Sequence, residues 1–266
     1  TDKEDNKSID DLESNNLDDI DNINLDDYGR LWVDKYRPQK LEDIILKKEY
    51  IDKISKWIED FTNKKKDFKT SLLLYGPPGT GKTTIANLIF KSYNYDAIEF
   101  NASDIRNQKL INSKVKEILG KKNILDMMLN KSRKMGIIMD EIDGMSSGDR
   151  GGISELIKLM YKGSKSKRGK NIKEEFTPFI CISNTVSEKK FNDIKKNSVV
   201  VKVSEPSNMN QMKIIERICK GENIEIDPYN INYIIKQSQG DYRRLINMIQ
   251  YVYLHKEKEK EKPKDI

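Results

Sequence analysis

The amino-acid sequence predicts an α/β protein in which a five-stranded parallel sheet carries helices on both faces and a small all-helical domain follows. Two observations lead to this fold class. Up to residue 206, short apolar runs alternate with stretches of helical periodicity, and such alternation is typical of a parallel sheet covered by helices. Beyond Pro206 the short runs stop and only helical patterns continue. This shift marks the second domain.

Five short apolar runs are the expected strands. Polar and apolar residues alternate poorly within them, as expected for strands that are buried on both faces of a sheet. In chain order the expected strands are Ser71–Tyr75, 97–100, 136–140, Phe179–Ser183 and 198–203.

Helices are expected between and after these strands. Residues 41–61 carry apolar side chains at steps of three and four, which places them on one face of a helix. The members of this face are Ile44, Ile51, Ile54, Trp57, Ile58 and Phe61. In the second domain, helical patterns cover 208–219, Pro228–Ser238 and 242–254.

Charge divides the chain further. The 266 residues carry a formal net charge of +6, but residues 1–27 hold eleven acidic and two basic side chains and so contribute −9, which leaves +15 for the rest. Such asymmetry indicates a polyanionic partner, the alternative being a solvated lysine-rich surface. We expect a disordered acidic linker at 1–29, an α/β domain at 30–206, a helical lid domain at 207–255 and a charged tail at 256–266. A lysine-rich loop is expected at 162–173.

Composition excludes several kinds of chemistry. Two cysteines, Cys181 and Cys219, and the single His255 leave too few ligands for a structural zinc site. The histidine lies in a lysine-rich tail, which argues against serine–histidine or cysteine–histidine catalysis. No apolar run approaches the roughly 18 residues of a membrane-spanning helix, and the acidic start of the chain is not a signal peptide. The sequence is typical of a reduced, intracellular protein.

A phosphate-binding motif follows the first predicted strand. Residues 76–83 read GPPGTGKT, which matches G-x-x-x-x-G-K-[ST], and a helical pattern comes next. Glycines in this context let backbone N–H groups surround phosphates at a helix N-terminus. Lys82 is expected to reach the β- and γ-phosphates, and the Thr83 hydroxyl to bind Mg²⁺. The expected phosphate-site residues are Gly76, Pro77, Pro78, Gly79, Thr80, Gly81, Lys82, Thr83 and Thr84.

Polar residues at the ends of other predicted strands complete a nucleoside-triphosphatase. Asp140 ends the strand at 136–140, where it would hold Mg²⁺, and Glu141 would polarise the attacking water. Asn184 follows another strand and could orient that water or contact the γ-phosphate, unless it only forms a turn. Arg243 opens the last helix and could bring the helical domain onto the γ-phosphate, the alternative being a surface ion pair.

These residues resemble an AAA+ P-loop ATPase, and more narrowly a clamp-loader subunit of the replication factor C family. Asn184 and five segments carry the resemblance: LWVDKYRP at 31–38, GPPGTGKTT at 76–84, EFNASD at 99–104, MDEIDGM at 139–145 and GDYRR at 240–244. The resemblance implies ATP and Mg²⁺ as cofactors. It also implies that Asn184 is sensor 1 and Arg243 sensor 2. The adenine and ribose side would be lined by Val33, Tyr36, Arg37 and Pro38.

The chain is more similar to the large subunit of that family than to its small subunits. Small subunits carry an arginine finger in a Ser-Arg-Cys motif, whereas residues 185–203 contain lysines but no arginine, and lysine lacks the planar fork of arginine. The upstream DNA-end-binding domain and the downstream collar of the large subunit are absent, so we expect a fragment. The implied function is ATP-driven loading of a ring-shaped sliding clamp onto primer–template DNA in the nucleus, with small subunits in a hetero-pentamer. Alternatives are the large subunit of a checkpoint or cohesion loader and a non-hydrolysing scaffold.

The resemblance also implies DNA- and clamp-facing segments. Arg106, Asn107 and Arg150 lie at the starts of predicted helices, where they would contact DNA phosphates without sequence specificity. Arg150 could instead pair with Asp149. Residues 122–129 (KNILDMML) resemble a degenerate clamp-binding peptide, although a core helix is the alternative.

Overall fold

The computed structural model describes residues 31–101, 134–144, 164–166, 173–186 and 191–261. These residues belong to two compact units. The first, here called the α/β unit, extends from Pro38 to Ser204. The second, here called the helical unit, combines residues 31–37 with the described residues from Glu205 onwards.

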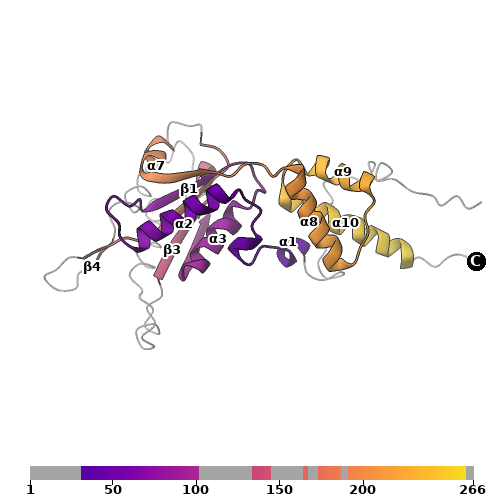
Figure 1. The fold of residues 1–266 in the computed structure, drawn as a ribbon, viewed down its shortest axis with the longest axis horizontal. Helices are drawn as coiled ribbons and strands as arrows, with labels where there is room; N and C mark the ends of the chain where they lie inside the picture. Colours follow the sequence, from indigo (N-terminus) through magenta and orange to yellow (C-terminus); the bar gives the residue numbers. More distant parts are fainter. Residues whose placement is uncertain (1–30, 102–133, 145–163, 167–172, 187–190, 262–266) are drawn as a thin grey trace, which may run out of the picture. The chain divides into compact units, whose positions relative to one another are not determined.

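The α/β unit contains the predicted five-stranded sheet (Figure 1). All its neighbouring strands run parallel, in the order β2-β3-β6-β1-β7. The strands are β1 (Ser71–Tyr75), β2 (Tyr95–Asn101), β3 (Lys134–Asp140), β6 (Phe179–Ser183) and β7 (Ser198–Lys202). Because β1 lies between β6 and β7, the loop that follows β1 is flanked by the carboxyl ends of these two strands. The five predicted strands are confirmed, with ends shifted by a few residues.

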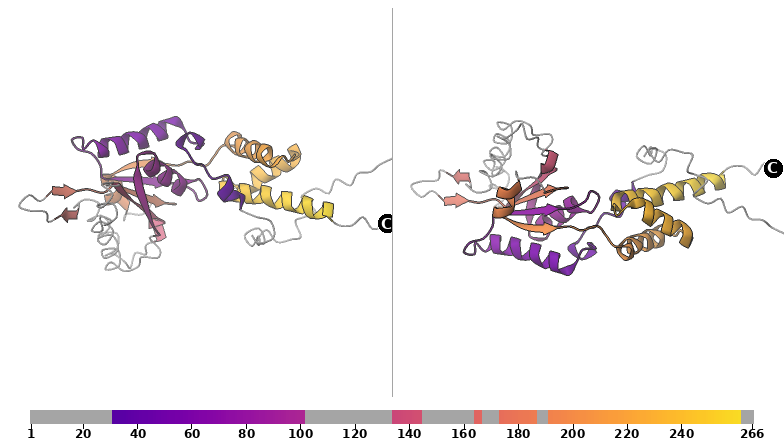
Figure 2. Two further views of the ribbon diagram at one scale, coloured as in Figure 1. Left: turned by 90° about the horizontal axis from the view of Figure 1, so that it is seen from below. Right: turned by 90° about the horizontal axis from the view of Figure 1, so that it is seen from above.

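Both faces of the sheet are buried. Helices α2 (Lys48–Thr62) and α3 (Lys82–Ser92) cover the face that carries Leu72 and Leu74 of β1 (Figures 1 and 2). The opposite face carries Leu73, which packs in a second cluster with side chains of α7 (Asn192–Asn197). Successive residues of β1 therefore enter different cores, which explains why the strand is apolar at every one of these positions.

Two local predictions were wrong. Helix α2 begins at Lys48 and not at residue 41, because the Asp43 carboxylate accepts hydrogen bonds from the backbone N–H groups of Gln39 and Lys40 and fixes a separate turn, η4 (Leu41–Asp43). The apolar residues before Lys48 still pack against the sheet cluster. In the segment 162–173, expected to be a loop, the described residues 164–166 form the strand β4 (Ser164–Ser166), which pairs antiparallel with β5 (Lys173–Glu175) at the end of the segment.

The helical unit contains the three predicted helices and one short addition. These helices are α1 (Trp32–Lys35), α8 (Asn208–Glu222), α9 (Pro228–Ser238) and α10 (Tyr242–Glu261). Their shared core is built from Ile215, Ile218, Ile234, Leu245 and Ile249, all at most 1% exposed. Helix α10 continues into the segment expected to be a charged tail. Among the described helices, none combines the length and the apolar character needed to cross a membrane.

The start of the α/β region differs from the sequence-based boundary. We placed it at residue 30, whereas residues 31–37 cluster with the helical unit. The physical reason is Trp32, which is 6% exposed and packs in the core of α8, α9 and α10.

Candidate nucleotide-binding site

The loop between β1 and α3 has the backbone conformation that its glycines permit. Gly79 and Gly81 have φ angles of 67° and 84°, a region that residues with a Cβ seldom adopt. A Cβ on Gly76 would lie 1.9 Å from the carbonyl oxygen of Val203. Helix α3 starts directly after this loop, at Lys82. The first N–H groups of a helix lack intrahelical acceptors and attract anions, so the loop and helix together suit a phosphate group.

Lys82 is held by groups that follow the carboxyl ends of β1 and β6. Its side chain is buried, and Nζ donates to the carbonyl oxygens of Gly76 and Pro77 at 2.8 and 2.7 Å. It also donates to Oδ1 of Asn184 at 2.9 Å. The ammonium therefore connects the loop after β1 with the end of β6, at the position where a phosphate on the loop would need a counter-charge.

Two oxygen-bearing side chains meet beside Lys82. Thr83 Oγ1 donates to Asp140 Oδ2 at 2.5 Å, and Asp140 Oδ1 accepts from the backbone N–H of Glu141 at 2.8 Å. Hydroxyl and carboxylate oxygens are the ligands that Mg²⁺ prefers. Thr83 and Asp140 therefore fit a magnesium ion bound next to the phosphate loop, as expected from the sequence.

Glu141 has an unusual backbone and a partner that the sequence reasoning did not identify. Its φ angle is 54°, a conformation that costs a non-glycine residue energy and is often found at functional sites. Oε2 accepts a hydrogen bond of 3.0 Å from Nδ2 of Asn101. Asn101 lies opposite Asp140 in the pairing of β2 with β3. The usable signal was its place at the end of a predicted strand, within the segment EFNASD.

Asn184 lies directly after β6 and is fixed through both its backbone and its side chain. The amide oxygen accepts from Lys82 at 2.9 Å, and the backbone N–H donates to Asp143 Oδ1 at 3.3 Å. Asp143 was not among the predicted site residues. The structure thus brings Lys82, Thr83, Asp140, Glu141 and Asn184 to the carboxyl ends of parallel strands, the usual place for ligands in open α/β sheets.

Most of the other residues predicted to contact the nucleotide belong to the helical unit. Val33, Tyr36 and Arg37 belong to the helical unit, and Pro38 is the first residue of the α/β unit. Arg243 lies in the first turn of α10, where its backbone N–H donates to Asp241 Oδ1 at 2.7 Å.

Three predicted DNA-contacting residues, Arg106, Asn107 and Arg150, lie outside the described residues, as does the segment 122–129. The DNA- and clamp-facing roles of these residues remain predictions.

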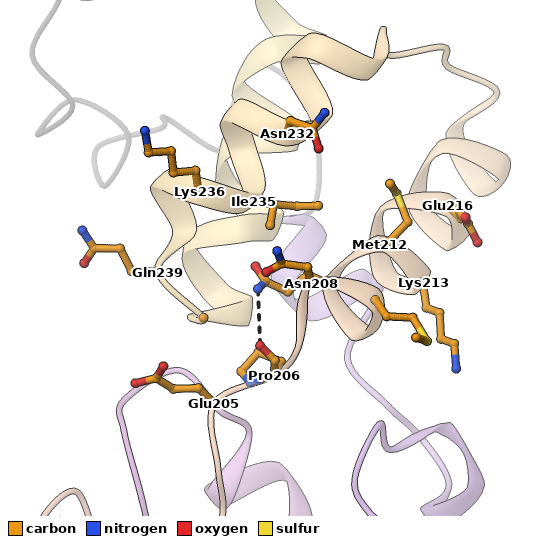
Figure 3. Close-up of a pocket in the computed structure, with 13 residues that line it drawn as sticks. Glu205, Pro206, Asn208, Met212, Lys213, Glu216, Asn232, Ile235, Lys236 and Gln239 are labelled. Carbon is orange, nitrogen blue, oxygen red and sulfur yellow. Dashed lines mark hydrogen bonds between the residues drawn. The ribbon is translucent and has the colours of Figure 1, made fainter.

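Each unit also contains a cavity. The α/β unit has one of about 590 Å³ next to the phosphate loop, bordered by Pro77, Pro78, Asn184, Lys195 and Lys202 among others. The helical unit has one of about 850 Å³ between α8 and α9 (Figure 3). There, the Gln211 side chain donates to the carbonyl oxygen of Pro206 at 3.4 Å. Apolar Met212 and Ile235 line this second cavity together with charged residues of both signs.

Known proteins share the sequence features of this chain. Residues 72–199 match the ATPase family associated with various cellular activities (AAA). The chain is 33% identical over 239 residues to replication factor C subunit 1 of Schizosaccharomyces pombe, and 34% identical over 220 residues to the replication factor C large subunit of Methanococcus maripaludis. Both alignments cover 82% of this chain, but they cover 24% of the first protein and 41% of the second. The chain thus spans a quarter to two fifths of these relatives.

Solved structures support the fold. Thermotoga maritima RuvB, a Holliday junction branch migration motor, aligns with a TM-score of 0.56 over 79% of this chain and 63% of its own, at 18% identity. At that identity the likeness concerns the fold alone. The phosphate loop, the sheet order and the matched family agree: residues 72–199 form a domain of the AAA family of ATPases, and the chain is similar to replication factor C large subunits over most of its length.

Proposed function

We propose that the chain binds and hydrolyses ATP as the motor part of a clamp-loader large subunit. The observation that carries the proposal is the convergence of five side chains at one sheet edge in a chain with a domain of the AAA family. Lys82 contacts Asn184, Thr83 contacts Asp140, and Glu141 follows Asp140 directly. This is the set of groups that phosphoryl transfer to water requires: a phosphate cradle, a metal site and a group that activates water.

Each residue has a separable role in the proposed reaction. The backbone of residues 76–84 and the Lys82 ammonium hold the β- and γ-phosphates, while Thr83 and Asp140 hold Mg²⁺, which when bound neutralises phosphate charge. Glu141 accepts a proton from the attacking water, and Asn184 orients that water. The hydrogen bond from Asn101 keeps the Glu141 carboxylate in one orientation.

The helical unit contributes the remaining proposed contacts. Val33, Tyr36 and Arg37, with Pro38 at the start of the α/β unit, would line the adenine and ribose. Arg243 would contact the γ-phosphate, as sensor 2. These roles are supported by the similarity of the segments LWVDKYRP and GDYRR to the replication factor C family.

The wider role is proposed from the named relatives. As a replication factor C large subunit, the chain would act in the nucleus with small subunits, a sliding clamp and primer–template DNA. ATP binding would close the assembly around an opened clamp, and hydrolysis would release the clamp on DNA during replication and repair. Arg106, Asn107 and Arg150 would contact the DNA backbone.

Turnover with partner subunits tests the catalytic proposal. Glu141→Gln should keep ATP binding and lower hydrolysis by about 10²–10⁴-fold, the usual contribution of a general base. The control Glu49→Gln alters an exposed glutamate on α2 and should leave both activities unchanged. Equal, measurable hydrolysis by wild type and Glu141→Gln would contradict the role of Glu141. ATP binding without any turnover in the wild-type assembly would instead support a non-hydrolysing scaffold.

A further inference from the structure

Within the helical unit, the segment 31–37 contacts the long helices at two points. At its start, the backbone N–H of Trp32 donates to Oε1 of Gln250 on α10 at 3.0 Å, in a buried position. The Trp32 ring lies 5.2 Å from the ring of Tyr253, also on α10. This end of the segment is therefore part of the core of the helical unit.

At the other end, Tyr36 is held by the last turn of α8. Its hydroxyl donates to Glu222 Oε1 at 2.7 Å, and Lys35 Nζ pairs with the same carboxylate oxygen at 2.5 Å. Burial and, next, this hydrogen bond raise the pKa of Tyr36 to about 12. Glu222 thus fixes two adjacent residues of the segment, and one of them belongs to the proposed adenine side.

Gly221 makes room for this contact. A Cβ at this position would lie 2.3 Å from the Tyr36 hydroxyl oxygen and 3.2 Å from two carbons of its ring. Gly221 is the last residue but one of α8, and glycine is a poorer helix former than alanine, by about 1 kcal/mol in a helix interior. Helix propensity alone would therefore favour alanine, and the contact with Tyr36 explains the glycine.

We infer that Gly221 and Glu222 are positioning residues for the nucleotide site: they set the place of Tyr36 and, through it, of the segment 31–37. The inference rests on the function proposed above. Neither residue touches the nucleotide in this scheme, and both lie some 180 positions away from Tyr36 in the chain. ATP affinity then depends on the end of α8.

The test compares variants of the whole chain for binding of Mg–ATP by titration calorimetry. Gly221→Ala should weaken ATP binding by about tenfold, which corresponds to ~1.4 kcal/mol, because the new methyl group displaces the Tyr36 hydroxyl. Adding Tyr36→Phe removes the hydroxyl oxygen at 2.3 Å and with it the hydrogen bond to Glu222, so the double variant should bind ATP as well as Tyr36→Phe alone and better than Gly221→Ala. If Gly221 acts in some way unrelated to Tyr36, the double variant should bind ATP no better than Gly221→Ala.

Glu222 gives an independent variant. Glu222→Ala should weaken binding, whereas Glu222→Gln retains an acceptor for the Tyr36 hydroxyl and should remain close to wild type. The matched control is Glu225→Ala, an exposed acid beyond the end of α8. The chain has two tryptophans, so in a Trp57→Phe background the fluorescence of Trp32 reports whether the segment has moved.

The outcomes are distinguishable. Displacement of Trp32 in Gly221→Ala with unchanged ATP affinity would overturn the inference, as would equal affinities of Glu222→Ala and Glu225→Ala. Failure of the wild-type chain to bind Mg–ATP would refute the proposed function itself. If Gly221→Ala does not fold, as judged by thermal melting, the comparison of the two Glu222 variants decides.

Discussion

Two neighbouring acids at the end of β3 have different partners, and this separates their chemistry. Asp140 accepts from the Thr83 hydroxyl and from a backbone N–H, and so faces the phosphate loop. Glu141 accepts from the Asn101 amide on the adjacent strand. The positive φ angle of Glu141 turns the chain at this point. One acid thereby suits a metal site and the other suits activation of water.

Asn101 offers a residue-scale prediction. Asn101→Ala removes the hydrogen bond that orients Glu141, so hydrolysis should fall by about tenfold or more, within the range that general-base catalysis contributes. ATP affinity should change little, because Asn101 has no proposed contact with the nucleotide. Steady-state turnover of the assembly measures the loss of hydrolysis, and calorimetric titration measures whether the ATP affinity is kept. A loss of affinity as large as the loss of turnover would contradict it.

Gly136 offers a second prediction at the scale of residues. A Cβ at this position of β3 would lie 2.6 Å from the Phe90 ring of α3, which is fully buried. Gly136→Ala should therefore lower the free energy of unfolding by about 1–3 kcal/mol, the usual cost of overpacking a core. Urea denaturation measures the effect. The double variant Gly136→Ala with Phe90→Leu should lose less stability than the sum of the losses in the two single variants. Strict additivity would show that the two residues do not collide.

At the scale of elements, side chains define where the helices of the helical unit begin. The Ser207 hydroxyl accepts from the backbone N–H of Asn210 at the start of α8. The Asp227 carboxylate accepts from the backbone N–H of Asn230 at 3.0 Å at the start of α9, and Pro228 occupies the first helical position. These are the residue types expected at helix N-termini, which is why the predicted starts of α8 and α9 are confirmed. Helix α2 lacks such a side-chain cap, and its start was misplaced.

Helix capping gives the element-scale prediction. Asp227→Ala should lower the free energy of unfolding of the helical unit by about 1 kcal/mol, because an N–H group of the first turn loses its acceptor. Asp227→Asn keeps an acceptor oxygen and serves as the matched control. Chemical denaturation followed by circular dichroism at 222 nm (the helix signal) measures both variants. Equal stability of the two would show that the capping contact contributes nothing.

At the scale of the whole molecule, the burial of a thiol makes the stability of the fold sensitive to high pH. Burial raises the pKa of the Cys181 thiol from 9.0 to about 12. The unfolded chain therefore releases this proton before the folded chain does. The stability linked to the neutral thiol is fully present below pH 9 and is lost as the pH rises from 9 towards 12.

This linkage can be measured with Cys181→Ala. The variant should be less stable than wild type at pH 7, because it leaves a cavity in the sheet core. Its stability should nevertheless fall less steeply between pH 9 and 11, because the buried thiol is gone. Cys219→Ala, which removes the less buried cysteine of the helical unit, is the control and should keep most of the wild-type slope. If the free energy of unfolding depends on pH in the same way in wild type and in Cys181→Ala, the Cys181 thiol is not the cause of the loss of stability at high pH.

The sequence determined the features that depend on neighbouring residues. Apolar runs such as SLLLY located the strands, and GPPGTGKT with its glycines located the phosphate loop, because a continuous apolar run and the loop conformation that glycines permit are local properties. The order of strands in the sheet then brought Asp140 and Asn184 to the same edge as Lys82, as the strand ends had suggested.

Contacts between distant residues were decided only by the tertiary structure. Asn101 meets Glu141 because β2 pairs with β3. Tyr36 meets Gly221 and Glu222 because Trp32 is buried with α8, α9 and α10 and not against the sheet. No local pattern encodes such pairs, since their energy arises from side chains that approach each other only after the core has formed. The sequence therefore specified the chemical groups of the candidate site, and packing determined which residues hold them in place.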